Sequence, residues 1–152
     1  MTDTASVPQA DYIRAYMSDR PVLPGRSALL VIDMQYATGS REGALGRKLA
    51  AQKSNAGDYR FERIETMVLP NTQRLLAGFR KAGHSIVYVT IGARLPDASD
   101  APAHMQNLFR ELGNHAGSRD HEILDVLTPR PGELVINKTT IGAFASSGID
   151  SL

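Results

Sequence analysis

The sequence predicts an α/β protein with a central parallel sheet, and three observations carry this prediction. Apolar segments that suit strands occur at 28–33, 85–90 and 133–137. The first begins with five apolar residues and no alternation, which is typical of a strand covered on both faces. A segment with helical spacing, 61–82, separates the first two strands and implies a right-handed crossover between parallel neighbours.

Composition describes a single ordinary domain. The 152 residues carry a net charge of +1 with scattered basic side chains, which gives no support for binding nucleic acid or an anionic membrane. No apolar run reaches the roughly 20 residues of a membrane span, and the amino terminus lacks a signal-peptide core. We therefore expect a cytoplasmic protein in which an irregular arm (1–26) precedes one domain (27–152).

The longest predicted helix is 61–82, where apolar residues recur at helical spacing. Pro70 should kink or divide this helix, and Gly83 should end it. The preceding stretch, 36–60, is polar and rich in glycine, and part of it (42–53) is a weaker helix candidate. It follows the carboxyl end of a strand, so it serves either as a substrate loop or as a plain surface insertion.

Shorter elements complete the chain. A short helix is expected at 105–112, and the composition of 129–132 predicts a turn before the third strand. Ser146 or Ser147 is expected to cap a last helix beginning near Gly148. A further short helix is expected within the arm, at 11–17.

Asp33 and Lys138 are the candidate chemical groups. Both follow predicted strands, and the carboxyl ends of parallel strands are where open α/β sheets bind ligands. There a carboxylate could accept the proton of a nucleophile while the ammonium lowers the pKa of that nucleophile. The alternatives are that Asp33 caps the next turn, or that the two residues form a structural salt bridge.

The sequence offers no metal site. It contains no cysteine, which excludes disulfides and thiolate ligands within this chain. The four histidines show none of the spacings of metal-binding motifs; they are His84, His104, His115 and His121. We expect no metal and no cofactor.

Six stretches of the sequence form a recognisable series, namely 29–35 (LLVIDMQ), 70–76 (PNTQRLL), 81–90 (KAGHSIVYVT), 129–138 (PRPGELVINK), 141–144 (IGAF) and 148–150 (GID). In order and spacing they resemble the isochorismatase-like cysteine hydrolases. The resemblance covers about 25–152, corresponds to the N-terminal portion of that fold and implies a small-molecule partner.

The resemblance implies a three-layer αβα, Rossmann-like fold and hydrolysis of small amides, ureides or related bonds. Most family members use an Asp, a Lys and a Cys, so Asp33 would be the general base and Lys138 the partner that favours the thiolate. We expect four further residues to contact substrate, although a solvated loop position is an alternative for the arginine. They are Gln35, Tyr36, Arg94 and Phe144.

This chain departs from the family pattern in two places. The zinc-binding branch carries Asp-x-His after the second strand, but this sequence reads IGAR at 91–94. The family cysteine follows a fourth strand, which the 152 residues do not reach. We therefore expect a truncated fold, an inactive form and an unpaired edge on the first strand that promotes homo-oligomers. The alternative is a non-catalytic relative that serves as a binding or oligomerisation module.

Overall fold

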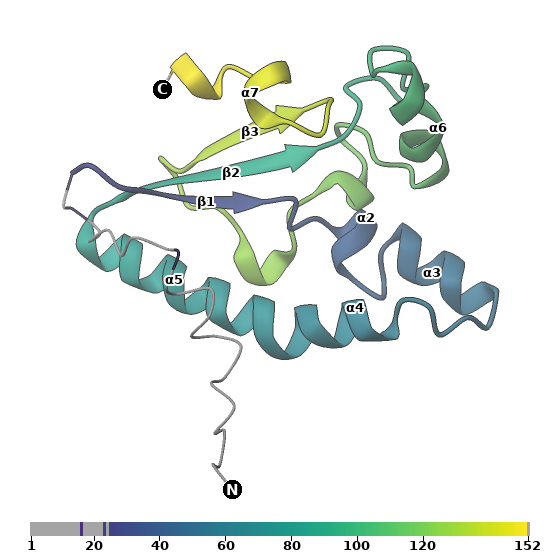
Figure 1. Cartoon of the computed structure of the whole chain (residues 1–152), viewed down its shortest axis with the longest axis horizontal. Helices are drawn as coiled ribbons and strands as arrows, with labels where there is room; N and C mark the ends of the chain where they lie inside the picture. The colour runs from purple at the N-terminus through teal and green to yellow at the C-terminus, as the bar shows by residue number, and fades with distance from the viewer. Residues whose placement is uncertain (1–15, 17–22, 24, 152) are drawn as a thin grey trace, which may run out of the picture.

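A parallel three-stranded sheet lies between helices in the computed structural model, which describes residues 16, 23 and 25–151 (Figure 1). The strand order is β1-β2-β3, with β1 at Ala28–Ile32, β2 at Ser85–Ile91 and β3 at Leu134–Lys138. All three strands point the same way, so their carboxyl ends share one edge. The predicted α/β class with a parallel sheet is confirmed.

Helical segments fill both connections between the strands, and further helical turns follow β3. The connection from β2 to β3 also holds short 3₁₀ turns. The α-helices are α2 (Tyr36–Gly39), α3 (Ala44–Ala51), α4 (Asp58–Arg63), α5 (Leu69–Ala82), α6 (Ala103–Glu111) and α7 (Ala143–Ser146). The other turns are the π-helix η1 (Ile64–Val68) and the 3₁₀-helices η2 (Arg119–His121), η3 (Asp125–Leu127) and η4 (Ile149–Ser151).

Helices α4 and α5 form one long rod with a π-helical turn between them (Figure 1). Pro70 lies in the first turn of α5, directly after this π turn. Proline has no N–H to donate to the preceding turn, and here the regular α-helical hydrogen bonding gives way to a π turn directly before it. The proline thus divides the predicted helix by a change of hydrogen bonding and leaves the rod continuous.

One face of the sheet packs against α5. The main core joins Val31 of β1 and Tyr88 of β2 to Leu76 of α5. The phenol of Tyr88 is fully buried and accepts a hydrogen bond from the Arg80 guanidinium at 3.1 Å. Burial, with the nearby Glu133 carboxylate, raises the pKa of Tyr88. This face supplies most of the buried apolar surface that supports the sheet.

The opposite face is largely open. Leu30 and Ile32 of β1 and Leu134 of β3 are each more than two-fifths exposed, so the prediction that the first strand is covered on both faces was wrong. The short α7 and η4 lie over this face, where Phe144 and Ile149 line a hollow with Leu30 and Leu134 (Figure 1). An apolar run indicates a buried strand, but it does not show which described element covers each face.

Three smaller predictions have different outcomes in the structure. Helix α3 forms within 42–53 despite its glycines. A last helical turn, η4, begins at Ile149, next to Gly148 as expected. The expected cap was wrong, because the Ser146 and Ser147 hydroxyls donate to the carbonyls of Gly142 and Ala143. The expected helix at 11–17 and most of the amino-terminal arm lie outside the described residues.

No helix within the described part combines the length and apolarity that a membrane crossing requires.

Candidate functional site

Asp33 and Lys138 meet at the shared carboxyl edge of the sheet. Lys138 Nζ donates to Asp33 Oδ2 at 3.1 Å and to the carbonyl oxygen of Ile141 at 2.8 Å. The Lys138 side chain is 5% exposed, whereas that of Asp33 is 37% exposed. The ammonium is therefore buried beneath a carboxylate that still reaches solvent. The sequence placed both groups at this edge, and the structure brings them into contact.

The backbone of Asp33 turns sharply away from the sheet. Its N–H still bonds the carbonyl of Val89 at 2.8 Å, but its φ of 57° lies in the left-handed region. Aspartate tolerates this region better than most residues, and such conformations gather at functional sites. The turn aims the side chain back toward Lys138.

At this pair, one hydrogen-bond acceptor and one hydrogen-bond donor have no protein partner among the described residues. Asp33 Oδ1 is buried and accepts no hydrogen bond. An ammonium group carries three N–H donors, and Lys138 uses two of them. Unsatisfied buried polar atoms are rare and need an explanation such as a ligand, a water molecule or a catalytic role. The arrangement can accept a proton on one side and donate a hydrogen bond to a carbonyl oxygen on the other.

Gln35 lies deep in the edge and contacts only protein. Its side chain is 1% exposed and bonds both the N–H and the carbonyl of Ile91, at 2.7 and 3.1 Å. It also donates to the carbonyl of His121 at 2.7 Å. These bonds give Gln35 a structural role, and its contact with substrate stays a prediction.

Tyr36 begins α2 and its ring is stacked under Arg119, whose guanidinium carbon lies 3.9 Å from the ring centre. The phenol oxygen accepts from the N–H of Asp125 at 3.4 Å, a long and weak contact. Tyr36 lines a hollow of about 240 Å³ with Leu69 and Leu124, and neither Asp33 nor Lys138 lines it.

Arg94 is exposed on the loop after β2. Its backbone is anchored because the Asp100 carboxylate accepts the N–H groups of Arg94 and Leu95, at 2.9 and 3.1 Å. Burial acts to raise the pKa of Asp100, but these two N–H groups outweigh it and the pKa is lowered. The guanidinium itself makes no hydrogen bond within the described residues.

Phe144 lies on α7 over the open face of the sheet and is 67% exposed. It lines an apolar hollow of about 370 Å³ with Leu30, Val87, Leu134 and Ile149. Of the four residues expected to contact substrate, Phe144 is the one on this face. The structure does not gather the four around the Asp33–Lys138 pair.

A partly buried polar cluster that local sequence patterns did not predict lies beneath this edge. Asn137 of β3 accepts hydrogen bonds from Thr90 Oγ1 at 3.1 Å and from His121 Nε2 at 2.8 Å, and donates to the Gly92 carbonyl at 2.9 Å. Asn114 lies beside Gln35 in the same cluster. The sequence feature that could have indicated this cluster is the pair of polar residues at the ends of apolar strands, Thr90 and Asn137.

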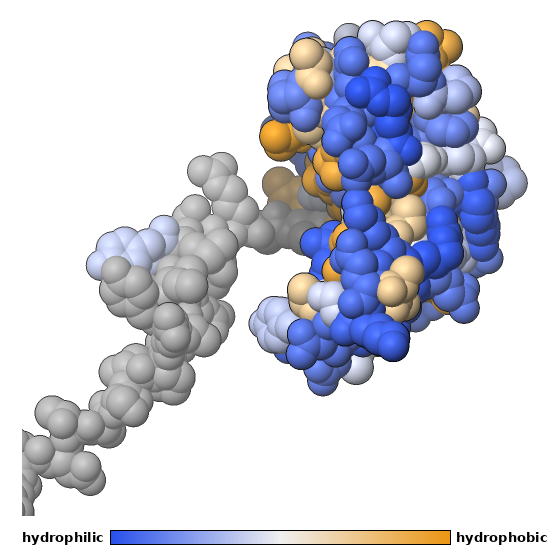
Figure 2. All heavy atoms as spheres, turned by 90° about the vertical axis from the view of Figure 1, so that its right-hand side faces the viewer, coloured by the Kyte–Doolittle hydropathy of each residue, from blue (hydrophilic) through white to orange (hydrophobic). Residues whose placement is uncertain are grey.

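Viewed from this edge, hydrophobic atoms show in the middle of a mainly hydrophilic surface (Figure 2).

The sequence profile of the Isochorismatase domain matches residues 27–152. The chain belongs to the isochorismatase family. The resemblance noted in the sequence is thereby confirmed, and with it the fold class that the family implies.

Curated relatives of this isochorismatase-family chain include two enzymes named ureidoacrylate amidohydrolase RutB. The protein from Pantoea ananatis (strain LMG 20103) is 28% identical over 143 residues, which is 85% of this chain and 53% of that protein. The protein from Pseudomonas syringae pv. syringae (strain B728a) is 27% identical over 144 residues, covering 85% and 54%. The chain thus spans about half the length of the curated relatives it matches.

Solved structures agree on the fold. A cysteine hydrolase from Pseudomonas syringae pv. phaseolicola 1448A superposes with a TM-score of 0.66 at 24% identity, covering 88% of this chain and 55% of that one. An isochorismatase family protein from Desulfovibrio vulgaris subsp. vulgaris str. Hildenborough gives a TM-score of 0.59 at 30% identity, covering 82% and 58%.

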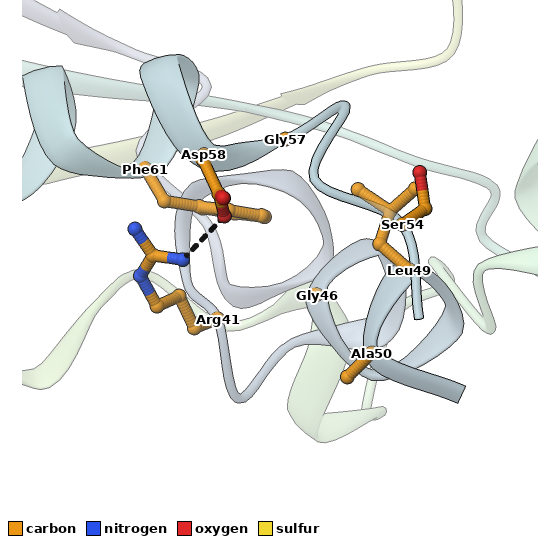
Figure 3. A pocket seen from close by; sticks show the side chains of 8 residues that line it. All are labelled: Arg41, Gly46, Leu49, Ala50, Ser54, Gly57, Asp58 and Phe61. Atoms are coloured by element: carbon orange, nitrogen blue, oxygen red, sulfur yellow. Dashed lines mark hydrogen bonds and ion pairs between the residues drawn. The ribbon is translucent and has the colours of Figure 1, made fainter. Parts of the chain in front are cut away.

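The hollow drawn in Figure 3 lies apart from the Asp33–Lys138 pair of this family member. It holds about 140 Å³ between α3 and α4, with Leu49 and Phe61 as apolar walls. Arg41 and Asp58 form an ion pair at 3.1 Å beside it. Nowhere in residues 25–151 do three side chains of the His, Cys, Asp and Glu types come together as a metal site requires. The expectation of no metal stays a prediction.

Proposed function

We propose that this chain carries the Asp–Lys part of a hydrolase site that cleaves the C–N bond of a small amide or ureide. The observation that carries the proposal is the contact between Asp33 and Lys138, 105 residues apart in sequence, at the carboxyl edge of the sheet. Membership of the isochorismatase family supports it, as do relatives named ureidoacrylate amidohydrolases.

In the proposed reaction Asp33 accepts the proton of a cysteine thiol, and Lys138 stabilises the resulting thiolate by its charge. The thiolate attacks the substrate carbonyl carbon and the C–N bond breaks. The amine leaves with the proton that Asp33 had accepted. Water then hydrolyses the thiol-bound intermediate. The 152 residues contain no cysteine, so we propose that this form by itself does not complete the reaction.

The test combines turnover with binding on the 152-residue chain. Ureidoacrylate and simple N-carbamoyl compounds are incubated with the protein, ammonia release is measured, and binding is followed by calorimetry. We expect no turnover, together with ureide binding that Asp33→Asn and Lys138→Met abolish. Ammonia release above the protein-free rate would contradict the proposed inactivity. Ureide binding that is unchanged in both variants would contradict the proposed site.

We also propose Arg94 and Phe144 as secondary substrate contacts.

The second candidate function is a non-catalytic binding or oligomerisation module. The open apolar face, on which Leu30, Ile32 and Leu134 are partly exposed, favours that second candidate. We propose that two copies associate through this face and the free edge of β1, because an uncovered strand edge pairs readily with another chain.

A further inference from the structure

We propose that Gln35 and Asn137 are positioning residues that hold Asp33 and Lys138 at contact distance. Each clamps one side of the same dipeptide at the end of β2, Ile91 and Gly92. The inference rests on the proposed function in treating the Asp33–Lys138 pair as a catalytic site. The clamps themselves are defined by contacts that do not depend on that function.

The first clamp replaces the backbone ladder where β1 leaves the sheet. Pairing between β1 and β2 stops because Asp33 adopts a φ of 57° and turns away. The Gln35 amide then takes over, since its Oε1 accepts from Ile91 N at 2.7 Å and its Nε2 donates to Ile91 O at 3.1 Å. A primary amide has the same donor and acceptor groups as a peptide, so it can imitate one more residue of strand. The clamp lies two residues beyond Asp33 and fixes its position.

The second clamp acts from β3. Asn137 Nδ2 donates to the Gly92 carbonyl at 2.9 Å, and Gly92 N donates to the carbonyl of Lys138 at 3.0 Å. Because Asn137 Nδ2 is a donor, Asn137 Oδ1 is the acceptor, so His121 Nε2 must carry the proton in their 2.8 Å hydrogen bond. Thr90 Oγ1 also donates to this oxygen, at 3.1 Å.

The two clamps are joined through His121. Its carbonyl accepts from Gln35 Nε2 at 2.7 Å, while its ring holds Asn137. The ring also packs against Gly92, where an added Cβ would lie 2.6 Å from His121 Cδ2 and 2.8 Å from Asn114 O. We call Gln35, Asn137 and His121 together the frame. Because its side chains pack this closely, loss of one clamp should displace the other.

The displacement matters because the Lys138 ammonium is buried. Its contact with Asp33 offsets the cost of removing a charge from water only while the two groups touch. A misplacement of about 1 Å in a catalytic pair can reduce a reaction rate by about 100-fold. We therefore expect the position of the Lys138 ammonium to depend on the two clamps as well as on its contact with Asp33.

The experiment reads the Lys138 ammonium directly by ¹H–¹⁵N NMR of the 152-residue protein. A buried, hydrogen-bonded ammonium exchanges its protons slowly enough to give a signal, which is assigned by its absence in Lys138→Met. Gln35→Glu keeps the shape and the acceptor but removes both N–H donors. We expect the signal to be lost in Gln35→Glu and retained in the control Gln106→Glu. This control removes the hydrogen bond from Gln106 of α6 to the carbonyl of Ala101.

A second pair of variants keeps the inference falsifiable if Gln35→Glu does not fold. His121→Phe keeps a planar ring but removes the donor to Asn137, whereas His121→Gln restores an N–H donor. We expect the Lys138 signal to be lost in the first and recovered in the second. A signal that persists in His121→Phe, or one that is lost equally in Gln106→Glu, would overturn the inference. These readouts need no substrate, so failure of ureide binding alone would count against the proposed function and leave the frame standing.

Discussion

Asp33 and Lys138 occupy unequal environments although they form one pair. The Lys138 side chain is 5% exposed and the Asp33 side chain 37% exposed, so the ammonium depends more on its partner for solvation than the carboxylate does. A buried charge that loses its partner is far more costly than an exposed one. The two halves of the pair should therefore respond differently to removal of the other.

This asymmetry predicts different stabilities for two single variants. Asp33→Asn keeps a residue that tolerates the left-handed backbone but leaves the ammonium uncompensated, and should lower the free energy of unfolding by about 2 kcal/mol. Lys138→Met leaves a carboxylate that water can reach, and should cost about 1 kcal/mol or less. Urea unfolding of both variants provides the measurement. Equal losses would show that the pair is not asymmetric.

A second ion pair joins α5 to the start of β3. Arg80 and Glu133 make two parallel contacts, Nε–Oε1 at 2.7 Å and Nη2–Oε2 at 2.9 Å, with 18% and 11% of their side chains exposed. The guanidinium hydrogen bonds lower the pKa of Glu133, outweighing burial, which acts to raise it. This pair closes the end of the sheet opposite to Asp33.

The lowered pKa predicts a loss of stability in acid. A carboxylate with a depressed folded-state pKa stabilises the protein fully above its unfolded pKa of about 4.3, and this contribution disappears as the pH falls through the folded-state value. Glu133→Gln should therefore lower the free energy of unfolding by about 2 kcal/mol at pH 7. The difference from the parent should shrink below pH 4. Glu111→Gln, which breaks an exposed pair with Lys48, is the control and should change little.

At the scale of elements, helix α5 shows what local signals specify. It ends at Gly83, which has a φ of 68°, and the N–H of His84 returns to the carbonyl of Phe79. This is the left-handed termination that a glycine after a basic last turn predicts. Pro70 also predicts an interruption, but the sequence did not predict that this interruption would take the form of a π turn at Ile64–Val68.

Two glycines of this helix give a matched pair of variants. Neither Gly78 nor Gly83 has any atom within 4 Å of an added Cβ, so only backbone conformation separates them. Gly78→Ala should raise the free energy of unfolding by about 0.5–1 kcal/mol, because glycine is costly inside a helix. Gly83→Ala should lower it by about 1 kcal/mol, because φ is positive there. Thermal unfolding of both variants would contradict this if they shifted in the same direction.

At the scale of the whole molecule, the sheet is covered unequally. Helix α5 packs against one face, while Leu30, Ile32 and Leu134 remain partly exposed on the other. No strand among residues 25–151 pairs with the outer edge of β1. Exposed apolar surface next to an unpaired strand edge is a typical setting for association between chains. The proposed homo-oligomer follows from this surface.

A single charge on the edge should separate the copies. Ile32→Lys places a lysine on the exposed side of β1, a device that natural sheets use to block edge pairing. Analytical ultracentrifugation should show self-association of the parent and a monomer for this variant. Leu108→Lys, at an exposed leucine of α6, is the control and should behave like the parent. A parent that stays monomeric at high concentration would contradict the proposal.

Local sequence patterns were enough to predict the three strands, the long helix and the edge at which Asp33 and Lys138 meet. These depend on local patterns, namely apolar runs, helical periodicity and the rule that parallel strands end at one edge. Tertiary structure decided the rest. Gln35 became a clamp because its amide meets Ile91, 56 residues away, and Asn137 was joined to His121 only by the register of β3. Contacts between distant segments depend on how elements pack, which no local pattern records.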